Sequence, residues 1–199
     1  VIYEAIGHCF DRLRNFAQAR FYYRKASHLN PEEGKLYFKI ACTYLNEGQW
    51  QSGIKNLEQA LQIHRLQPDY NLAMGECKMQ LGQYKEAIHY FSIVVRQRPR
   101  SSTGWEALIR CLYFGEFFEE ADRQISAALT CTDQKPLFHY YAAAIAFARQ
   151  ETKQALQSLE KGLMAAPRLL RKLIGLNPSL LQNQQVVDLI ARYKRKSTR

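Results

Sequence analysis

Among the chemically reactive residue types of this 199-residue sequence, cysteine is the most regularly spaced. Cys9, Cys77 and Cys111 occupy the same position of a 34-residue period, and Cys42 lies one residue early in its own period. A ladder of thiols could bind metal, but packed helices are roughly 10 Å apart, whereas a zinc ion needs its sulfur ligands at about 2.3 Å. Free cysteine commonly fills apolar cores instead. We therefore predict buried cysteines, no metal site and no cofactor.

The other reactive side chains form no catalytic pattern. The five histidines are scattered, and no GxSxG, P-loop or dinucleotide-binding glycine motif occurs. Carboxylates such as Glu58, Glu86 and Glu160 occur singly among Lys and Gln, so that no acid–base pair is indicated. We therefore predict that the chain is not an enzyme.

The net charge of +10 is concentrated at the C-terminus, where eight basic residues and one acid follow residue 167. A cluster of this kind is typical of a solvated helix end, which argues against nucleic acid as the partner. Binding of a nucleic acid or an anionic surface through the basic tail, Arg192–Arg199, stays open as an alternative hypothesis.

The sequence carries no run of 18 apolar residues, so we expect no membrane span. Five cysteines without a CxxC pair favour a reducing compartment, and hence the cytoplasm. The sequence does not begin with Met, and Val1 falls inside a predicted helix with no capping residue before it. We therefore expect the natural chain to continue upstream with further repeats, and a periplasmic or anchored form stays open.

A period of 34 residues organises the sequence. A small residue recurs with this period. In four of five cases an aromatic residue precedes it by three positions, and in every case a large apolar residue follows it by four positions. The small residues are Ala19, Gly53, Ala87, Ala121 and Ala155, and the large ones are Tyr23, Leu57, Phe91, Ile125 and Leu159. Spacings of three, four and seven place residues on one helical face. Gly48 and Gly82 lie where one helix should end, and Pro31, Pro99 and Pro167 where the next should end. Each period therefore predicts a helix, a tight turn and a second helix.

This unit resembles the tetratricopeptide repeat (TPR), most clearly through Met74-Gly75, Tyr84, Ala87, Phe91 and Pro99. The resemblance implies an all-α fold, a right-handed α-solenoid of five helical hairpins with a C-terminal capping segment. The expected units are residues 1–33, 34–67, 68–101, 102–135 and 136–167, and residues 168–199 form the capping helices and the basic tail.

The predicted cap ends in an amphipathic helix. Asn183 is placed to cap it, and its apolar face would be Val186, Val187, Ile190 and Tyr193. A solenoid needs such a terminal element, which covers the last hairpin and presents a polar face to water. No matching element precedes Val1, so self-assembly through an uncapped N-terminal face, giving a homo-oligomer, is a further hypothesis.

The resemblance also implies a function: a protein-interaction scaffold that binds a peptide or amphipathic helix of another protein in a concave groove lined by the first helices. Carried onto this sequence, the groove residues are Phe38, Leu45, Leu72, Glu76, Met79, Arg110, Tyr113, Phe114, Tyr140 and Tyr141. For Tyr140 the alternative is burial under the C-terminal cap.

TPR proteins that hold acidic chaperone tails carry a clamp of Lys, Asn and Arg on their first helices. The matching positions here hold Glu4, His8, Lys39, Asp69 and Ala73, so the clamp is absent. A partner with an apolar or amphipathic helical segment is therefore expected.

Overall fold

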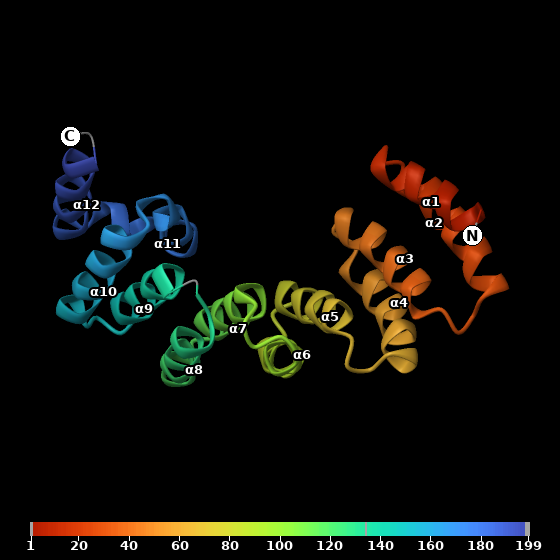
Figure 1. Ribbon diagram of the computed structural model, residues 1–199, viewed down its shortest axis with the longest axis horizontal. Helices are drawn as coiled ribbons and strands as arrows, with labels where there is room; N and C mark the ends of the chain where they lie inside the picture. The colour runs from red at the N-terminus through yellow and green to blue at the C-terminus, as the bar shows by residue number, and fades with distance from the viewer. Residues whose placement is uncertain (1, 134, 198–199) are drawn as a thin grey trace. The chain divides into compact units, whose positions relative to one another are not determined.

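The computed structural model describes residues 2–133 and 135–197, and in these residues it contains helices and no strand (Figure 1). The predicted all-α class is therefore confirmed. The chain forms two compact units, Val1–Arg98 and Pro99–Arg199. No helix among the described residues is long and apolar enough to cross a membrane.

The N-terminal unit contains three helical hairpins, in which α1 packs on α2, α3 on α4 and α5 on α6. Its helices are α1 (Ile2–Arg12), α2 (Phe16–Leu29), α3 (Gly34–Asn46), α4 (Trp50–Ile63), α5 (Pro68–Gln80) and α6 (Tyr84–Gln97). Consecutive hairpins contact each other through α2 with α3 and α4 with α5. Each second helix therefore covers the first helix of the next hairpin.

The C-terminal unit contains two hairpins, α7 with α8 and α9 with α10, followed by three short elements and a last helix, α12. The elements are α7 (Ser102–Phe114), α8 (Phe118–Cys131), α9 (Lys135–Ala148), α10 (Thr152–Ala165), η1 (Pro167–Leu169), α11 (Leu170–Leu176), η2 (Pro178–Gln182) and α12 (Gln184–Ser197). The division of the chain into five repeats at residues 34, 68, 102 and 136 stays a prediction.

Small residues allow the two helices of a hairpin to approach closely. Gly75 on α5 faces the Phe91 ring on α6, and a Cβ atom added there would lie 2.5 Å from a ring carbon. Gly7 meets Tyr23 in the same way, with a ring carbon at 2.7 Å. Tyr23 and Phe91 are fully buried. Gly7 and Gly75 on the first helices therefore fit against two of the periodic large residues of the second helices.

The turn inside each hairpin repeats one backbone conformation. Gly48 and Gly82 have φ angles of 71° and 73°, and Arg14, Glu116 and Gln150 adopt the same left-handed conformation at 57°, 61° and 63°. All five positions are separated by 34 residues. In each turn the next residue's N–H donates to the carbonyl five residues before it, as from Gln83 to Lys78 at 2.9 Å. This is the Schellman pattern, which ends the first helix.

The C-terminal segment covers the last hairpin, as predicted. Leu173, Leu180, Val186 and Ile190 join Tyr140 and its neighbours on α9 and α10 in one buried cluster. The Asn183 side chain caps α12 by accepting hydrogen bonds from the N–H groups of Gln185 and Val186, at 3.0 and 3.4 Å. The predicted place of Val187 in the apolar face is wrong: it is 38% exposed, because neighbouring residues point about 100° apart around a helix.

We expect Gly75→Ala to lower the free energy of unfolding by about 1–3 kcal/mol, because its methyl group would displace the buried Phe91 ring. Urea unfolding followed by circular dichroism measures this. Gly175→Ala is the control, because a Cβ atom there meets nothing within 4 Å. Equal effects of the two substitutions would contradict the close packing of α5 on α6.

Candidate functional site

Four predicted groove residues of the N-terminal unit lie on its first helices. Phe38 and Leu45 on α3, and Leu72 and Glu76 on α5, are all half-buried. Intervals of seven and four residues place each pair on one side of its helix, and α3 contacts α5. We call these four residues the first-helix surface. It offers partly exposed apolar side chains from two neighbouring helices.

Packing fixes the two α3 residues of the first-helix surface. The Phe38 ring stacks on the Tyr70 ring with 4.8 Å between their centres. Phe38 and Leu45 both pack against the buried cluster that includes Met74. Leu72 lies outside this cluster as far as the described residues show, so its replacement should disturb the core least.

A pair of ionic contacts ties α1 to α3 beside the first-helix surface. The Glu4 carboxylate accepts a hydrogen bond from Lys39 at 2.7 Å and lies 3.3 Å from the Lys35 ammonium. The hydrogen bond from Lys39 lowers the pKa of Glu4 against the opposing effect of burial. The Lys39 ammonium also lies 5.5 Å from the centre of the Tyr23 ring. Lys39 is therefore already engaged within the unit.

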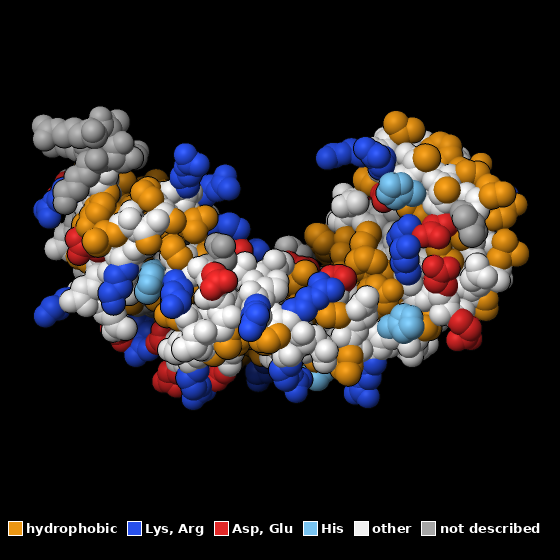
Figure 2. All heavy atoms as spheres, viewed as in Figure 1, with side chains coloured by type: hydrophobic (Ala, Val, Ile, Leu, Met, Phe, Trp, Pro, Cys, Tyr) orange, Lys and Arg blue, Asp and Glu red, His pale blue; other side chains and the backbone are white. Residues whose placement is uncertain are grey.

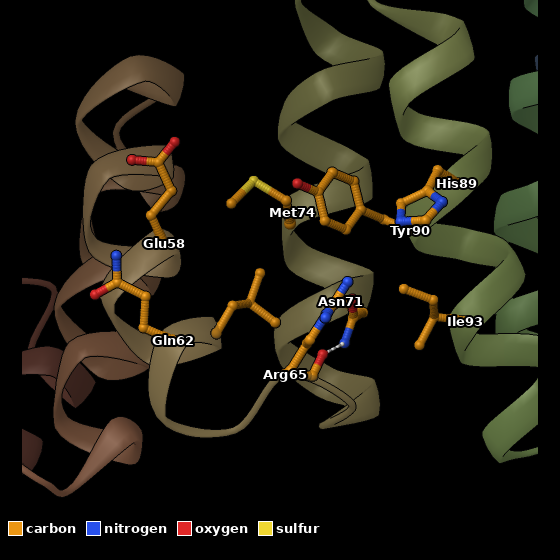
Figure 3. Close-up of a pocket in the computed structure, with 9 residues that line it drawn as sticks. Glu58, Gln62, Arg65, Asn71, Met74, His89, Tyr90 and Ile93 are labelled. Atoms are coloured by element: carbon orange, nitrogen blue, oxygen red, sulfur yellow. Dashed lines mark hydrogen bonds between the residues drawn. The ribbon is translucent and has the colours of Figure 1, made fainter.

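A cavity of about 440 Å³ lies between the second helices α4 and α6 of the same unit. Figure 3 shows Glu58 and Gln62 on one side, His89, Tyr90 and Ile93 on the other, and Met74 and Asn71 of α5 between them. Leu61 and Arg65 complete its lining. Sequence reasoning missed this cavity, because it treated the second helices only as packing elements.

Two models of one protein family match the sequence. Residues 2–33 and 44–111 match models of the tetratricopeptide repeat, which together cover about half of the chain. The chain belongs to the tetratricopeptide-repeat family. The matches fall on the hairpins in which the periodic small and aromatic residues pack together.

Solved structures share the fold of this TPR chain at low sequence identity. YrrB, described as a TPR protein with an unusual peptide-binding site, superposes with a TM-score of 0.70 at 18% identity, covering 94% of this chain and 89% of YrrB. MamA superposes with a TM-score of 0.73 at 13% identity, covering 80% of this chain and 93% of MamA. MamA from Desulfovibrio magneticus RS-1 gives 0.72 at 15% identity, with coverages of 89% and 94%.

The predicted exposure of Met79 is wrong. Met79 lies on α5 with the first-helix surface residues, but it is only 6% exposed. The reason is that α5 has neighbours on several sides, since it contacts α3, α4 and α6. A partner of the TPR chain cannot reach this side chain without displacing a helix.

The predicted exposure of Tyr140 and Tyr141 in the C-terminal unit is also wrong. They are 0% and 2% exposed, because α9 is surrounded by α7, α8, α10, α11 and η1. The Tyr140 hydroxyl donates to the carbonyl of Ala166 at 3.0 Å, and the Tyr141 hydroxyl donates to Glu106 at 2.9 Å. Burial raises the pKa of both hydroxyls. Tyr140 is therefore buried under the C-terminal cap, which was the alternative to a place in the groove.

The remaining groove residues of the C-terminal unit lie on α7. Arg110 and Tyr113 are half-buried, and Phe114 is 41% exposed. Tyr113 packs against the cluster that the C-terminal segment completes, and burial raises the pKa of its hydroxyl. The α11 residue Lys172 pairs with Glu106 on α7. The chain's own C-terminal segment thus occupies much of the first-helix face in this unit.

The thiols are distributed only partly as predicted. Cys77 and Cys111 are buried and Cys42 is half-buried, but Cys9 is exposed, as is Cys131. Burial raises the pKa of Cys42 to about 11 and that of Cys77 to about 12, so both stay protonated at neutral pH. No group of three or more His, Cys, Asp or Glu side chains that could hold a metal ion occurs among the described residues.

The basic tail is described only in part. Arg192 is exposed on α12. The side chains of Lys194, Arg195, Lys196 and Arg199 lie outside the described residues, as does Val1.

We expect Glu4→Gln to lower the free energy of unfolding by less than about 1 kcal/mol at pH 7. The pKa of Glu4 is lower in the folded state than in the unfolded state. The Glu4–Lys39 ion pair therefore stabilises the folded chain at pH values above the unfolded pKa of about 4.3, and this stabilisation is lost as the pH falls through the folded pKa. The deficit should therefore shrink in urea unfolding as the pH falls below about 4.3.

The matched control for this experiment is Glu32→Gln, at an exposed residue between α2 and α3. A deficit of Glu4→Gln that persisted unchanged at pH 3 would show that the ionised carboxylate is not its cause.

Proposed function

We propose that this TPR chain is a protein-interaction scaffold that binds an apolar or amphipathic helical segment of another protein on the first-helix surface. Membership of the TPR family supports a binding role. The similarity to YrrB, described as having a peptide-binding site, is consistent with a peptide or helical segment as the ligand.

The partly exposed apolar side chains of Phe38 and Leu72, on the neighbouring helices α3 and α5, are the observation that carries this proposal, whereas Leu45 is turned toward Gly53 of α4. Side chains of this kind, held at fixed positions by the helices below them, suit the anchor residues of an amphipathic helix at intervals of three, four and seven. Because Phe38 and Leu45 are packed in place, little side-chain entropy would be lost on binding.

The charged residues beside the first-helix surface favour an apolar partner over an acidic tail. Lys39 is engaged by Glu4 at 2.7 Å, and Asp69 is engaged by Arg98 at 2.7 Å. A partner carboxylate would have to compete with Glu4 for Lys39. Binding through the basic tail and the absence of catalysis both stay predictions.

Peptides selected by the TPR chain from a displayed library should bind Leu72→Glu at least about tenfold more weakly than the unmodified chain. The reason is that a carboxylate at this position would have to be desolvated against the apolar face of the peptide. Fluorescence anisotropy of the labelled peptides measures the dissociation constants.

Leu66→Glu is the matched control, because Leu66 is 56% exposed in the turn between α4 and α5. Unchanged circular dichroism of both variants excludes unfolding as the cause. If the peptides bound Leu72→Glu as tightly as the unmodified chain, the first-helix surface would not be their binding site.

A further inference from the structure

The cavity between α4 and α6 lies beside a position at which the third hairpin lacks a ring. Asn71 of α5 lines this cavity and is 1% exposed. The same position of the 34-residue period carries a ring in every other period of the sequence, as Tyr3, Tyr37, Trp105 and His139. A small side chain in the place of a large one leaves a cavity where its surroundings do not collapse.

Trp105 shows how a ring is held at this position of the period. It is 6% exposed, and its Nε1–H donates a hydrogen bond of 2.7 Å to the carbonyl of Pro99, six residues before it. The Asn71 Nδ2 donates a hydrogen bond of 2.9 Å to the carbonyl of Arg65, which is also six residues before it. Asn71 therefore reproduces the hydrogen bond of the indole ring but not the volume of the ring.

The Asn71 amide leaves one acceptor at the bottom of the cavity. Its Nδ2 donates a second hydrogen bond of 2.9 Å, to the carbonyl of Gln67, so both of its N–H groups are engaged. Its oxygen accepts no hydrogen bond from the described residues. A buried acceptor without a donor is costly, and a ligand that brought an N–H group into the cavity would remove this cost.

The walls of the cavity suit a flat apolar ring. Leu61 comes from α4, Met74 from α5, and Tyr90 and Ile93 from α6. Figure 3 shows the Met74 thioether between the side chains of α4 and Tyr90. Thioethers and aromatic rings both make favourable contacts with an aromatic guest. The volume of about 440 Å³ lies within the usual range for ligand pockets, ~300–1,000 Å³.

The rim of the cavity is polar and open to solvent. Its exposed residues carry charges of both signs, and they are Glu58, Gln62, Arg65 and His89. Figure 2 likewise shows acidic and basic side chains interspersed on the visible face of the N-terminal unit. Mixed charges suit a polypeptide better than a nucleic acid, which requires a basic surface. An open cavity also suits one side chain of a polypeptide that continues past the rim, because free small molecules are bound with most of their surface buried.

We propose that this cavity binds a tryptophan side chain of another protein. The indole ring lies against Met74 and Tyr90, and its N–H donates to the Asn71 oxygen. Tryptophan fits better than phenylalanine, because its ring carries a hydrogen-bond donor. The two tryptophans of this chain are already packed within it, since Trp105 is buried and Trp50 lies against the core cluster of the N-terminal unit.

The cavity is distinct from the first-helix surface. Asn71 and Met74 are three residues apart on α5, so they lie on one side of this helix. Leu72 and Glu76 lie on a different side of it, because successive residues of a helix point about 100° apart. Leu72→Glu should therefore leave binding at the cavity unchanged, so the two proposals can fail independently.

NMR of isotope-labelled methionine methyl groups tests the proposal, with N-acetyl-tryptophanamide as the probe. The chain contains three methionines, Met74, Met79 and Met164. The ring current of a bound indole should shift the Met74 resonance, and the shift should saturate with a dissociation constant on the order of 1 mM for so small a ligand. Met79 and Met164 do not line the cavity, so their resonances are internal controls.

Asn71→Trp supplies the ring from the chain itself and should abolish the response of Met74 to the probe, with circular dichroism unchanged. Gln59→Trp is the matched control, because Gln59 is exposed on α4 and lies outside the lining of the cavity. The benzothiophene analogue of the probe, in which sulfur replaces the indole N–H, should bind the unmodified chain about fivefold more weakly, because the Asn71 oxygen then has no donor.

Three results would overturn the proposal. A Met74 resonance that does not move at about 20 mM probe shows that the cavity takes no indole. Binding of the probe to folded Asn71→Trp as tightly as to the unmodified chain, or equal affinities of the probe and its benzothiophene analogue, places the ring elsewhere. If Asn71→Trp does not fold, the comparison of the two ligands decides alone. Free indole that bound at least about tenfold more tightly than the probe would assign the cavity to a small molecule in place of a side chain of a partner.

Discussion

The contact between a small residue on one helix and a large side chain on its hairpin partner is the constraint on which the structure depends. Gly7 against Tyr23 and Gly75 against Phe91 leave no room for another carbon atom, so they fix how closely the two helices lie. A single hairpin held in this way still has an apolar outer side. The next hairpin must cover it, and for this reason the pattern recurs every 34 residues.

The sequence was sufficient to predict whatever depends on neighbours within one period. The hairpins, the buried small residues and the Asn183 cap follow from spacings of three to seven residues and from local hydrogen bonds. The left-handed conformation of Arg14, Glu116 and Gln150 was not predicted, because none of these residues is a glycine. Their conformation is imposed by hydrogen bonds between backbone groups on either side of the turn.

The accessible residues of the candidate site could be predicted only in part, because accessibility depends on segments that are distant in the sequence. Tyr141 donates a hydrogen bond to Glu106, and Glu106 also pairs with Lys172 of α11, which follows it by 66 residues. Met79 is enclosed because α5 contacts three other helices. The cavity beside Tyr90 likewise requires α4 and α6 to stand apart over α5. A helical period identifies the face on which a residue lies, but not what covers that face.

Helix α1 borders the first-helix surface, because its Glu4 pairs with Lys39 of α3. Its position is held by Gly7 against Tyr23 on one side and by Glu4 with Lys39 on another. The second contact reaches α3 one residue from Phe38. Since the ion pair is partly exposed and weak, the Gly7–Tyr23 packing dominates the position of α1 with respect to its neighbours.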